Sequence, residues 1–290
     1  MLASIANLEL AARRVVEGFL LGLHRAPSFG FSQEFADYRP YEPGDDPRLI
    51  DWNVYARTDR AYLKRYRGET NAPLMVLLDA SASMGLDPDR RGESVRKIAY
   101  AKLLAAALAL LASRQHDAVG LIVFDDAVRE YRPPSTRTGW LRQILHTIEC
   151  AEPGSHTDIG LAFERFRAST RRRGMVAMIS DLYCDPAALA HSLQPLALRG
   201  QDVMLLHVLD PAERAPKGDG PAILVDAETR EEIPVSARFL RSEYPQRVEE
   251  HIGKLARAAA DLRADHVLLT TDEPLDRALR RYLLFRQRRA

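Results

Sequence analysis

From Pro73 onward, short apolar runs alternate with longer segments in which apolar residues recur at helical spacing. The runs are continuous, which is typical of parallel strands covered on both faces. The predicted buried strands span residues 74–78, 119–124, 175–179, 203–209 and 266–270, with 127–131 as a short antiparallel neighbour. The predicted helices span residues 93–114, 139–149, 159–170, 186–199, 238–263 and 275–286. This alternation predicts an α/β fold with a doubly wound, mostly parallel sheet.

The first 70 residues have a different pattern. Residues 1–24 place apolar side chains near one face of a helix, whereas residues 24–70 are rich in Pro, Gly and charge. We interpret 24–70 as loops and short strands, with 61–66 as the best strand candidate. Because so few loop-rich residues cannot bury a core alone, we expect residues 1–70 to pack on a main domain of residues 71–290. That domain carries a hairpin insertion near 222–236, with strands at 223–225 and 232–235.

Composition narrows the classes of partner. The chain has 290 residues, with 41 Lys and Arg against 40 Asp and Glu, a formal net charge of +1. This balance argues against a nucleic-acid or anionic-membrane binder, which needs a basic excess. Its 2 cysteines form no disulfide framework, and no apolar run approaches the roughly 20 residues of a membrane-spanning helix. Charged residues interrupt the N-terminus before any signal-like apolar segment. We therefore expect a cytoplasmic protein without stable membrane insertion.

The most informative motif lies directly after the first predicted buried strand. It reads Asp79-Ala80-Ser81-Ala82-Ser83 and places three oxygen-bearing side chains at alternate positions of a tight loop. Ligands of such sheets bind beyond the carboxyl ends of the strands. Carboxylate and hydroxyl oxygens suit a small, hard divalent cation, and a site with few carboxylates fits Mg²⁺ best.

Further oxygen-bearing residues fall where such a site needs them. Thr157 lies in the loop that opens a predicted helix, and Asp181 follows the third buried strand. If the first and third strands are neighbours, these side chains can converge with those of the first loop. Asp125 and Asp126 follow the second buried strand, so they could act on a bound metal through its other ligands or be solvated loop acids.

Asp-x-Ser-x-Ser, a later Thr before a helix and an Asp closing a later strand resemble the metal-ion-dependent adhesion site of von Willebrand factor A domains. The resemblance implies a Rossmann-type, von Willebrand factor A-like fold. It implies that Ser81, Ser83 and Thr157 bind Mg²⁺ directly or nearly so, while Asp79 and Asp181 act largely through water. Mn²⁺ and Ca²⁺ are alternative ions. The remaining coordination position would accept an acidic residue of a partner protein.

The N-terminal part resembles a specific bacterial family. The motifs that carry this likeness are Gly30-Phe31-Ser32-Gln33-Glu34-Phe35, Tyr38-Arg39-Pro40-Tyr41-Glu42-Pro43-Gly44-Asp45-Asp46-Pro47-Arg48, Ile50-Asp51-Trp52 and Ala56-Arg57-Thr58. They are similar to domain-of-unknown-function family fifty-eight, and the likeness spans residues 24 to 240. Members often accompany MoxR-type AAA+ ATPases. The resemblance implies an adaptor or co-chaperone whose partner is such an ATPase or a client that it remodels.

The charged residues of this N-terminal part have two interpretations. In one, arginines and aspartates pair to fix the loop-rich segment on the main sheet, with Trp52 as a buried anchor. In the other, they form a docking surface. The residues concerned are Arg39, Arg48, Arg57, Asp45, Asp46 and Asp51.

Three functions remain open. The first is a non-catalytic, metal-dependent protein-binding module. The second is a metal-dependent phosphate-ester hydrolase, but the chain has neither a Gly-x-x-x-x-Gly-Lys-Ser/Thr loop nor a Gly-x-Ser-x-Gly elbow. Ser81 also stands where an aspartyl-phosphate enzyme would place a second Asp. The third is a structural protein with a degenerate, empty site. We predict the first, and no enzymatic activity.

Overall fold

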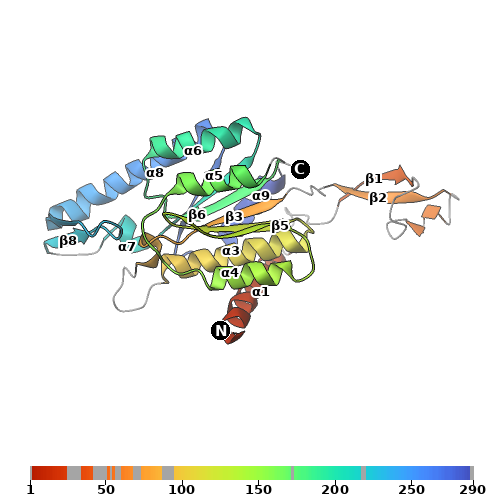
Figure 1. Ribbon diagram of the computed structural model, residues 1–290, viewed down its shortest axis with the longest axis horizontal. Coiled ribbons are helices and arrows are strands. Elements are labelled where there is room, and N and C mark those ends of the chain that lie inside the picture. The colour runs from red at the N-terminus through yellow and green to blue at the C-terminus, as the bar shows by residue number, and fades with distance from the viewer. Residues whose placement is uncertain are drawn as a thin grey trace.

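The computed structural model describes residues 2–24, 34–41, 51–52, 54–55, 60–67, 73–86, 95–170, 173–216 and 220–287. At its centre lies a six-stranded sheet in the order β10-β7-β6-β3-β4-β5 (Figure 1). The strands are β3 (Leu74–Asp79), β4 (Val119–Phe124), β5 (Val128–Ser135), β6 (Met175–Ser180), β7 (Asp202–Leu209) and β10 (Asp265–Thr270). Neighbours pair in parallel except β4 and β5, which are antiparallel.

The chain reverses its direction across the sheet between β3 and β6. From β3 it proceeds to β4 and β5 on one side, and it then crosses to β6, β7 and β10 on the other. β3 and β6 are hydrogen-bonded neighbours, with Leu78 opposite Ile179. Ligands of open α/β sheets bind at such a reversal point, beyond the carboxyl ends of the strands. The residues that follow Leu78 and Ile179 therefore lie where a ligand site is expected.

Helices cover both faces of the sheet because successive side chains of its strands point to opposite sides. Leu74, Val76 and Leu78 pack into one core, and Met75 and Leu77 into the other. The first core is closed by α1 (Leu2–His24), α3 (Lys97–Arg114), α4 (Trp140–Glu149) and α9 (Asp276–Gln287). The second is closed by α5 (Ile159–Ser169), α6 (Pro186–Leu198) and α8 (Tyr244–Asp261). The predicted α/β fold with a doubly wound, mostly parallel sheet is confirmed.

An insertion follows β7 at the carboxyl edge of the sheet. It begins with the short α7 (Pro211–Arg214) and continues into an antiparallel hairpin of β8 (Ala222–Val225) and β9 (Glu232–Val235). The predicted hairpin is therefore present. The predicted helix over 238–263 is divided into a π-helical turn, η3 (Phe239–Glu243), and α8. Pro245 stands in the first turn of α8, where its missing N–H leaves no helical hydrogen bond unmade.

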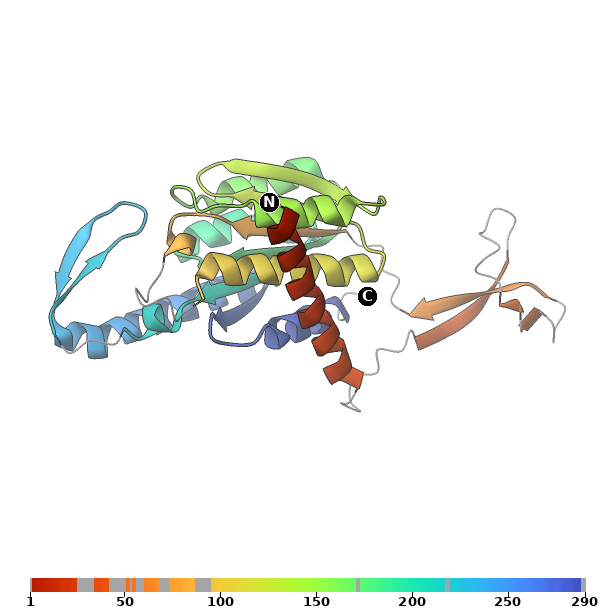
Figure 2. The same ribbon diagram turned by 90° about the horizontal axis from the view of Figure 1, so that it is seen from below.

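The N-terminal extension has two parts with different surroundings. Helix α1 buries Ala12, Val16 and Phe19 in the first core. Strands β1 (Glu34–Pro40) and β2 (Tyr62–Arg67) form a separate antiparallel pair that extends away from the body (Figure 2). Strand β2 agrees with the expected strand at 61–66, whereas β1 was not distinguished from the surrounding loops.

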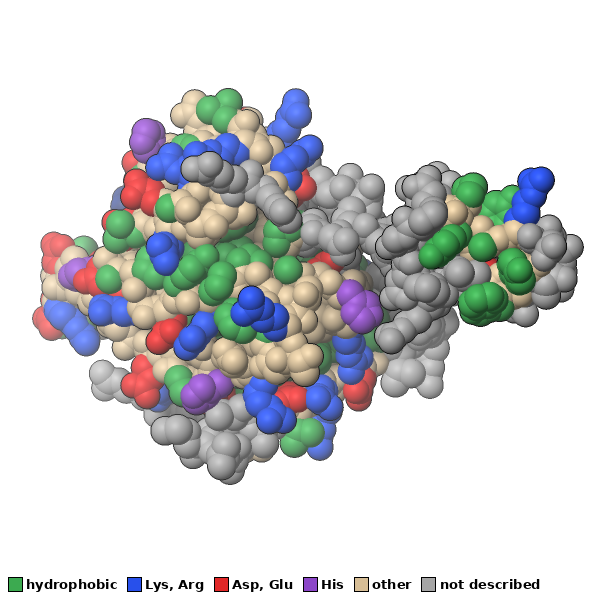
Figure 3. Space-filling view, turned by 45° about the vertical axis from the view of Figure 1, so that its right-hand side comes forward, with side chains coloured by type: hydrophobic (Ala, Val, Ile, Leu, Met, Phe, Trp, Pro, Cys, Tyr) green, Lys and Arg blue, Asp and Glu red, His purple; other side chains and the backbone are tan. Residues whose placement is uncertain are grey.

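The expectation that Trp52 is a buried anchor is wrong. Its side chain is 60% exposed and makes an edge-to-face contact with Tyr55, with 5.9 Å between ring centroids. Figure 3 shows hydrophobic side chains at the surface of the described part of this extension. The indole stays exposed because this segment accompanies the β1–β2 pair rather than the main core.

Candidate functional site

Strand β3 ends on a buried carboxyl group followed by a turn that its own side chain organises. The Ser81 backbone N–H donates to Oδ1 of Asp79 at 2.8 Å. The Ser81 and Ser83 hydroxyl oxygens are 3.0 Å apart, and both side chains are buried. Ser83 begins a single 3-10 turn, η2 (Ser83–Gly85). The local sequence thus brings one carboxyl and two hydroxyl groups together, as the motif predicted.

The neighbouring strand β6 contributes a second carboxyl group to the same place. The Ser180 hydroxyl donates to Oδ2 of Asp79 at 2.6 Å and accepts the Leu182 N–H at 3.0 Å. Asp181 follows and is 1% exposed. Burial, together with repulsion from Asp181, raises the pKa of Asp79 to about 7. The structure therefore brings Asp79, Ser81, Ser83 and Asp181 together at the carboxyl ends of adjacent strands.

A buried lysine that the sequence analysis did not single out completes this cluster. The Lys97 ammonium lies 2.7 Å from Oδ2 of Asp181 and 2.7 Å from Oε1 of Glu213, and its side chain is 0% exposed. It also lies 5.0 Å from the Tyr183 ring centroid. Burial acts to lower the pKa of Lys97, but the carboxylates of Asp181 and Glu213 outweigh it and raise that pKa. Lys97 therefore stays protonated.

No group of three His, Cys, Asp or Glu side chains in the described part of the chain is arranged to hold a metal ion, so any fit to a divalent cation rests on hydroxyl as well as carboxylate oxygens. Oδ1 of Asp181 is a buried acceptor with no hydrogen-bond partner in the described part of the chain. Asp181 and Glu213 both pair with the Lys97 ammonium, while Asp79 and Asp181 repel each other, so the cluster has more carboxyl groups than cationic groups. An unpaired buried acceptor and uncompensated carboxylates are costly. A hard cation bound by carboxylate and hydroxyl oxygens would relieve both costs.

The loop between α4 and α5 closes over the end of β3. The Gly154 N–H donates to the Ala80 carbonyl at 2.7 Å, and the Ala82 N–H donates to the Ser155 carbonyl at 2.8 Å. Asp125, which follows β4 and is 1% exposed, accepts the Ser155 N–H at 3.4 Å. Three segments distant in sequence are thus joined at one edge of the sheet.

Asp125 and Asp126 have different surroundings. Asp125 receives Nε of Arg129 at 2.7 Å and the Ala127 N–H at 3.0 Å, so it organises the turn into β5. Asp126 pairs with the Arg129 guanidinium at 2.9 Å on the surface. Both contact the loop that carries Ser155: Asp125 accepts the Ser155 N–H, and a side-chain hydrogen bond with Ser155 lowers the pKa of Asp126.

Thr157 belongs to the same loop, but its hydroxyl group binds elsewhere. Oγ1 donates to Oε1 of Glu228 at 2.8 Å, and the Thr157 backbone N–H donates to Oε2 of Glu228 at 3.2 Å. Glu228 lies in the turn between β8 and β9. The fifth predicted metal ligand is therefore engaged by a hairpin carboxylate that the sequence analysis did not connect with it.

Gly154 is the position at which this loop tolerates no side chain. A Cβ added there would overlap Oδ2 of Asp125 and lie 3.2 Å from its Cγ. We expect Gly154→Ala to destabilise the fold by about 1–3 kcal/mol, because the buried Asp125 is held in place and cannot yield freely. Urea unfolding measures this change. Gly253→Ala in α8 is the control, since its nearest neighbour would be Arg257 at 3.8 Å. Equal effects of the two substitutions would contradict this account.

The residues predicted as a docking surface are not brought to this cluster. Arg39 lies in β1 opposite Leu63, and the buried Asp51 accepts the Val54 N–H at 3.4 Å. Both belong to the extension that stands apart from the body (Figure 2). Arg48 and Arg57, like Asp45 and Asp46, lie outside the described residues.

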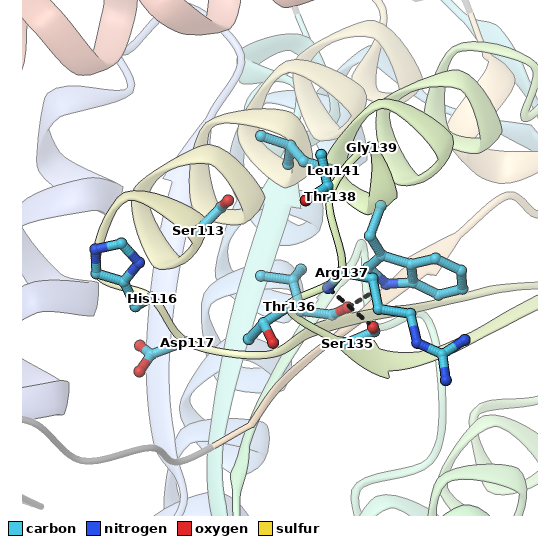
Figure 4. Close-up of a pocket in the computed structure, with 11 residues that line it drawn as sticks. Ser113, His116, Asp117, Ser135, Thr136, Arg137, Thr138, Gly139 and Leu141 are labelled. Carbon is cyan, nitrogen blue, oxygen red and sulfur yellow. Dashed lines mark hydrogen bonds between the residues drawn. The ribbon is translucent and has the colours of Figure 1, made fainter. Parts of the chain in front are cut away.

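A separate cavity of about 220 Å³ opens at the opposite edge of the sheet (Figure 4). It lies where β4 begins, and the Trp140 indole N–H there donates to the Val119 carbonyl at 2.9 Å. The Arg137 N–H closes the neighbouring turn on Oγ of Ser135 at 3.2 Å. The cavity lies at the amino end of β4 and the carboxyl end of the antiparallel β5, so it takes no part in the cluster around Asp79.

Curated relatives match nearly the whole chain. The uncharacterized proteins Mb1516 of Mycobacterium bovis and Rv1480 of Mycobacterium tuberculosis are each 28% identical over 293 residues, covering 99% of this chain and 90% of the relative. None of the described helices has the length and hydropathy required to cross a membrane.

Solved structures resemble the chain at low sequence identity. The pilus adhesin SpaC from Lactobacillus rhamnosus GG has a TM-score of 0.50 and 10% identity, covering 90% of this chain and 37% of the adhesin. The hypothetical protein BatB from Bacteroides thetaiotaomicron has a TM-score of 0.49 and 18% identity, covering 75% of this chain and 99% of BatB. The SpRpn10 VWA domain has a TM-score of 0.43 and 10% identity, covering 72% of this chain and 94% of that domain.

The family itself is shown by the sequence. Residues 37–254, well over half of the 290 in the chain, match the family described as Protein of unknown function DUF58. The chain belongs to this family.

Proposed function

We propose that this chain is a non-catalytic protein-binding module whose affinity depends on a divalent cation, Mg²⁺ in the first instance. The observation that carries the proposal is the buried, unpartnered Oδ1 of Asp181 beside Asp79. Asp79, Asp181, Ser81 and Ser83 would hold the ion. When bound, the ion would offer a coordination position to a carboxylate of a partner protein.

The hydrogen bonds of the cluster favour binding over nucleophilic catalysis. An activated hydroxyl needs a general base within hydrogen-bond reach. The Ser81 hydroxyl is shared between the Ser83 hydroxyl, at 3.0 Å, and the Asp79 carboxyl, whose oxygens also accept the Ser81 N–H and the Ser180 hydroxyl. The Ser180 hydroxyl contacts Asp79, but it is buried and also accepts the Leu182 N–H. These contacts hold the side chains in fixed positions, as a ligand-binding site requires.

The partner that we propose is a MoxR-type AAA+ ATPase or a client protein that it remodels, with this chain as adaptor or co-chaperone in the cytoplasm. Family resemblance supports this choice of partner. The geometry supports the need for an acidic residue on the partner. The cluster lies at the carboxyl edge of the sheet, where ligands of open α/β sheets bind.

The test uses the full chain and the MoxR-type ATPase of the same genome. We expect Ser81→Ala to weaken Mg²⁺-dependent binding by at least tenfold in calorimetry, because it removes one hydroxyl ligand and leaves the strand intact. Asp79→Ala should abolish that binding. Ser192→Ala is the matched control, since this half-buried hydroxyl donates to the Ala188 carbonyl of its own helix. If EDTA and both site substitutions leave the binding affinity unchanged, the proposal is refuted.

A further inference from the structure

The tip of the hairpin of β8 and β9 contacts the body of the protein through the Glu228 carboxylate. Glu228 accepts the Thr157 hydroxyl at 2.8 Å and the Thr157 N–H at 3.2 Å. Nδ1 of His156 lies 3.7 Å from Oε2 of Glu228. A hydroxyl, a backbone N–H and an imidazole thus converge on one carboxylate, which is how proteins recognise an acidic side chain.

The turn of the hairpin is shaped to present this carboxylate. Oδ1 of Asp226 accepts the backbone N–H groups of Glu228 and Thr229, each at 2.8 Å. These hydrogen bonds lower the pKa of Asp226, so its carboxylate stays ionised and keeps the turn closed. Side chains of Asp that bond N–H groups two and three residues ahead are typical of tight turns. Glu228 is therefore held in one orientation.

The stem of the hairpin is poorly buried for its composition. Ile223, Val225 and Ile233 are 58%, 50% and 52% exposed. Leu224, Ile233 and Val235 line an open groove of about 630 Å³, whose other wall includes residues of η3 and α8. Figure 2 shows that the hairpin stands out from the body at one end of the molecule. A ribbon that buries so little apolar surface depends on the contact at its tip.

The groove is largely apolar, and its polar lining includes one basic and one acidic side chain, Arg247 and Asp185. Phe239, Tyr244 and Ile252 form part of its wall, and the Arg247 guanidinium lies 5.3 Å from the Phe239 ring centroid. No ion pair between Arg247 and a carboxylate is formed within the described residues. The groove, together with the hydroxyl, N–H and imidazole groups of Thr157 and His156, therefore complements a segment that combines apolar and acidic residues.

We propose that Thr157 and His156 form a carboxylate-binding corner for a partner protein, and that Glu228 occupies this corner in the free chain. The occupant is an extended partner segment in which an apolar run precedes an acidic residue. The displaced hairpin has that chemistry itself, since Ile223-Leu224-Val225-Asp226-Ala227-Glu228 runs from the groove to the corner. The inference goes beyond the proposed function because it requires no bound cation.

The test is done in EDTA, so that it is independent of the cation cluster. The probe is a fluorescent peptide of residues 221–230 of this chain, with a matched peptide carrying Glu228→Gln. The peptides are titrated into the full chain and into its Glu228→Ala and Glu232→Ala variants. Glu232 is the control because it is an exposed acid of the same hairpin, opposite Val225.

We expect the first peptide to bind Glu228→Ala at least fivefold more tightly than the unaltered chain or Glu232→Ala. The peptide carrying Glu228→Gln should show no such gain in affinity. The first peptide should show no gain for the double variant Thr157→Val, Glu228→Ala. Hydrogen exchange of β8 and β9 should accelerate at least tenfold in Glu228→Ala and stay unchanged in Glu232→Ala.

Two results would overturn the inference. Unchanged exchange in Glu228→Ala would show that the carboxylate does not hold the hairpin. Equal peptide affinity across the three chains would show that no displaceable corner exists. Loss of Mg²⁺ binding would leave both readouts intact, so the two proposals fail separately.

Discussion

Replacing Lys97 by Met is expected to destabilise the fold by about 3–5 kcal/mol, the cost of removing one partner from a buried ion pair. The ammonium is 2.7 Å from each of two carboxylates, and the side chains of Lys97 and Asp181 are both 0% exposed. Met retains the length of the aliphatic stem, so the loss reflects charge rather than volume. Urea unfolding at pH 7 in EDTA measures the change.

Two controls separate the charge from the general cost of altering α3. Lys102→Met, one turn further along, removes a single hydrogen bond to the Glu149 carbonyl and should cost about 1 kcal/mol. The double variant Lys97→Met, Asp181→Asn should recover part of the lost stability, because it removes a carboxylate that has lost its partner. If Lys97→Met costs no more than Lys102→Met, the buried pair does not stabilise this end of the sheet.

Acidification from pH 7 to pH 5 is expected to lower the stability by about 2 kcal/mol through His207 alone. Burial and the neighbouring His266 lower the pKa of His207 from 6.5 to about 3. The folded state therefore keeps this imidazole neutral, while the unfolded chain binds a proton below its ordinary pKa. The stabilisation is complete above pH 6.5 and is lost progressively as the pH falls toward 3.

Neighbouring basic side chains also lower the pKa of His207. His266 on β10 lies 3.1 Å away between ring nitrogens, while His251 on α8 and Lys97 on α3 add positive charge. We expect His207→Gln to reduce the slope of unfolding free energy against pH by about one proton between pH 5 and 6. Urea unfolding at a series of pH values measures this slope. His191→Gln, on the exposed side of α6, is the control. An unchanged slope in His207→Gln would contradict the assignment.

Several parts of the fold were readable from local sequence. A continuous apolar run identifies a strand buried on both faces without knowledge of its neighbours, which is why β3, β4, β6 and β7 lie within a residue or two of their predicted bounds. The polar residue that ends such a run then lies at the carboxyl edge. Asp79 and Asp181 were found in this way, and their adjacency follows from the pairing of β3 with β6.

Other features carried weaker local signals. Ser180 directly precedes Asp181 and could have been found by the same strand-end argument. Trp52 was misjudged, because a large aromatic residue among charges does not reveal whether its segment packs on the core or on a separate extension.

The sequence by itself determined the order of strands and helices and the side chains that end the central strands, because these depend on residues within a few positions of one another. Only the tertiary structure decided which distant charges meet there. Lys97 reaches Asp181 across 84 positions, and Glu228 reaches Thr157 across 71. The chain has four other Lys residues and many other Glu residues. Which of them is buried in a pair depends on how whole elements pack, and that information is not local.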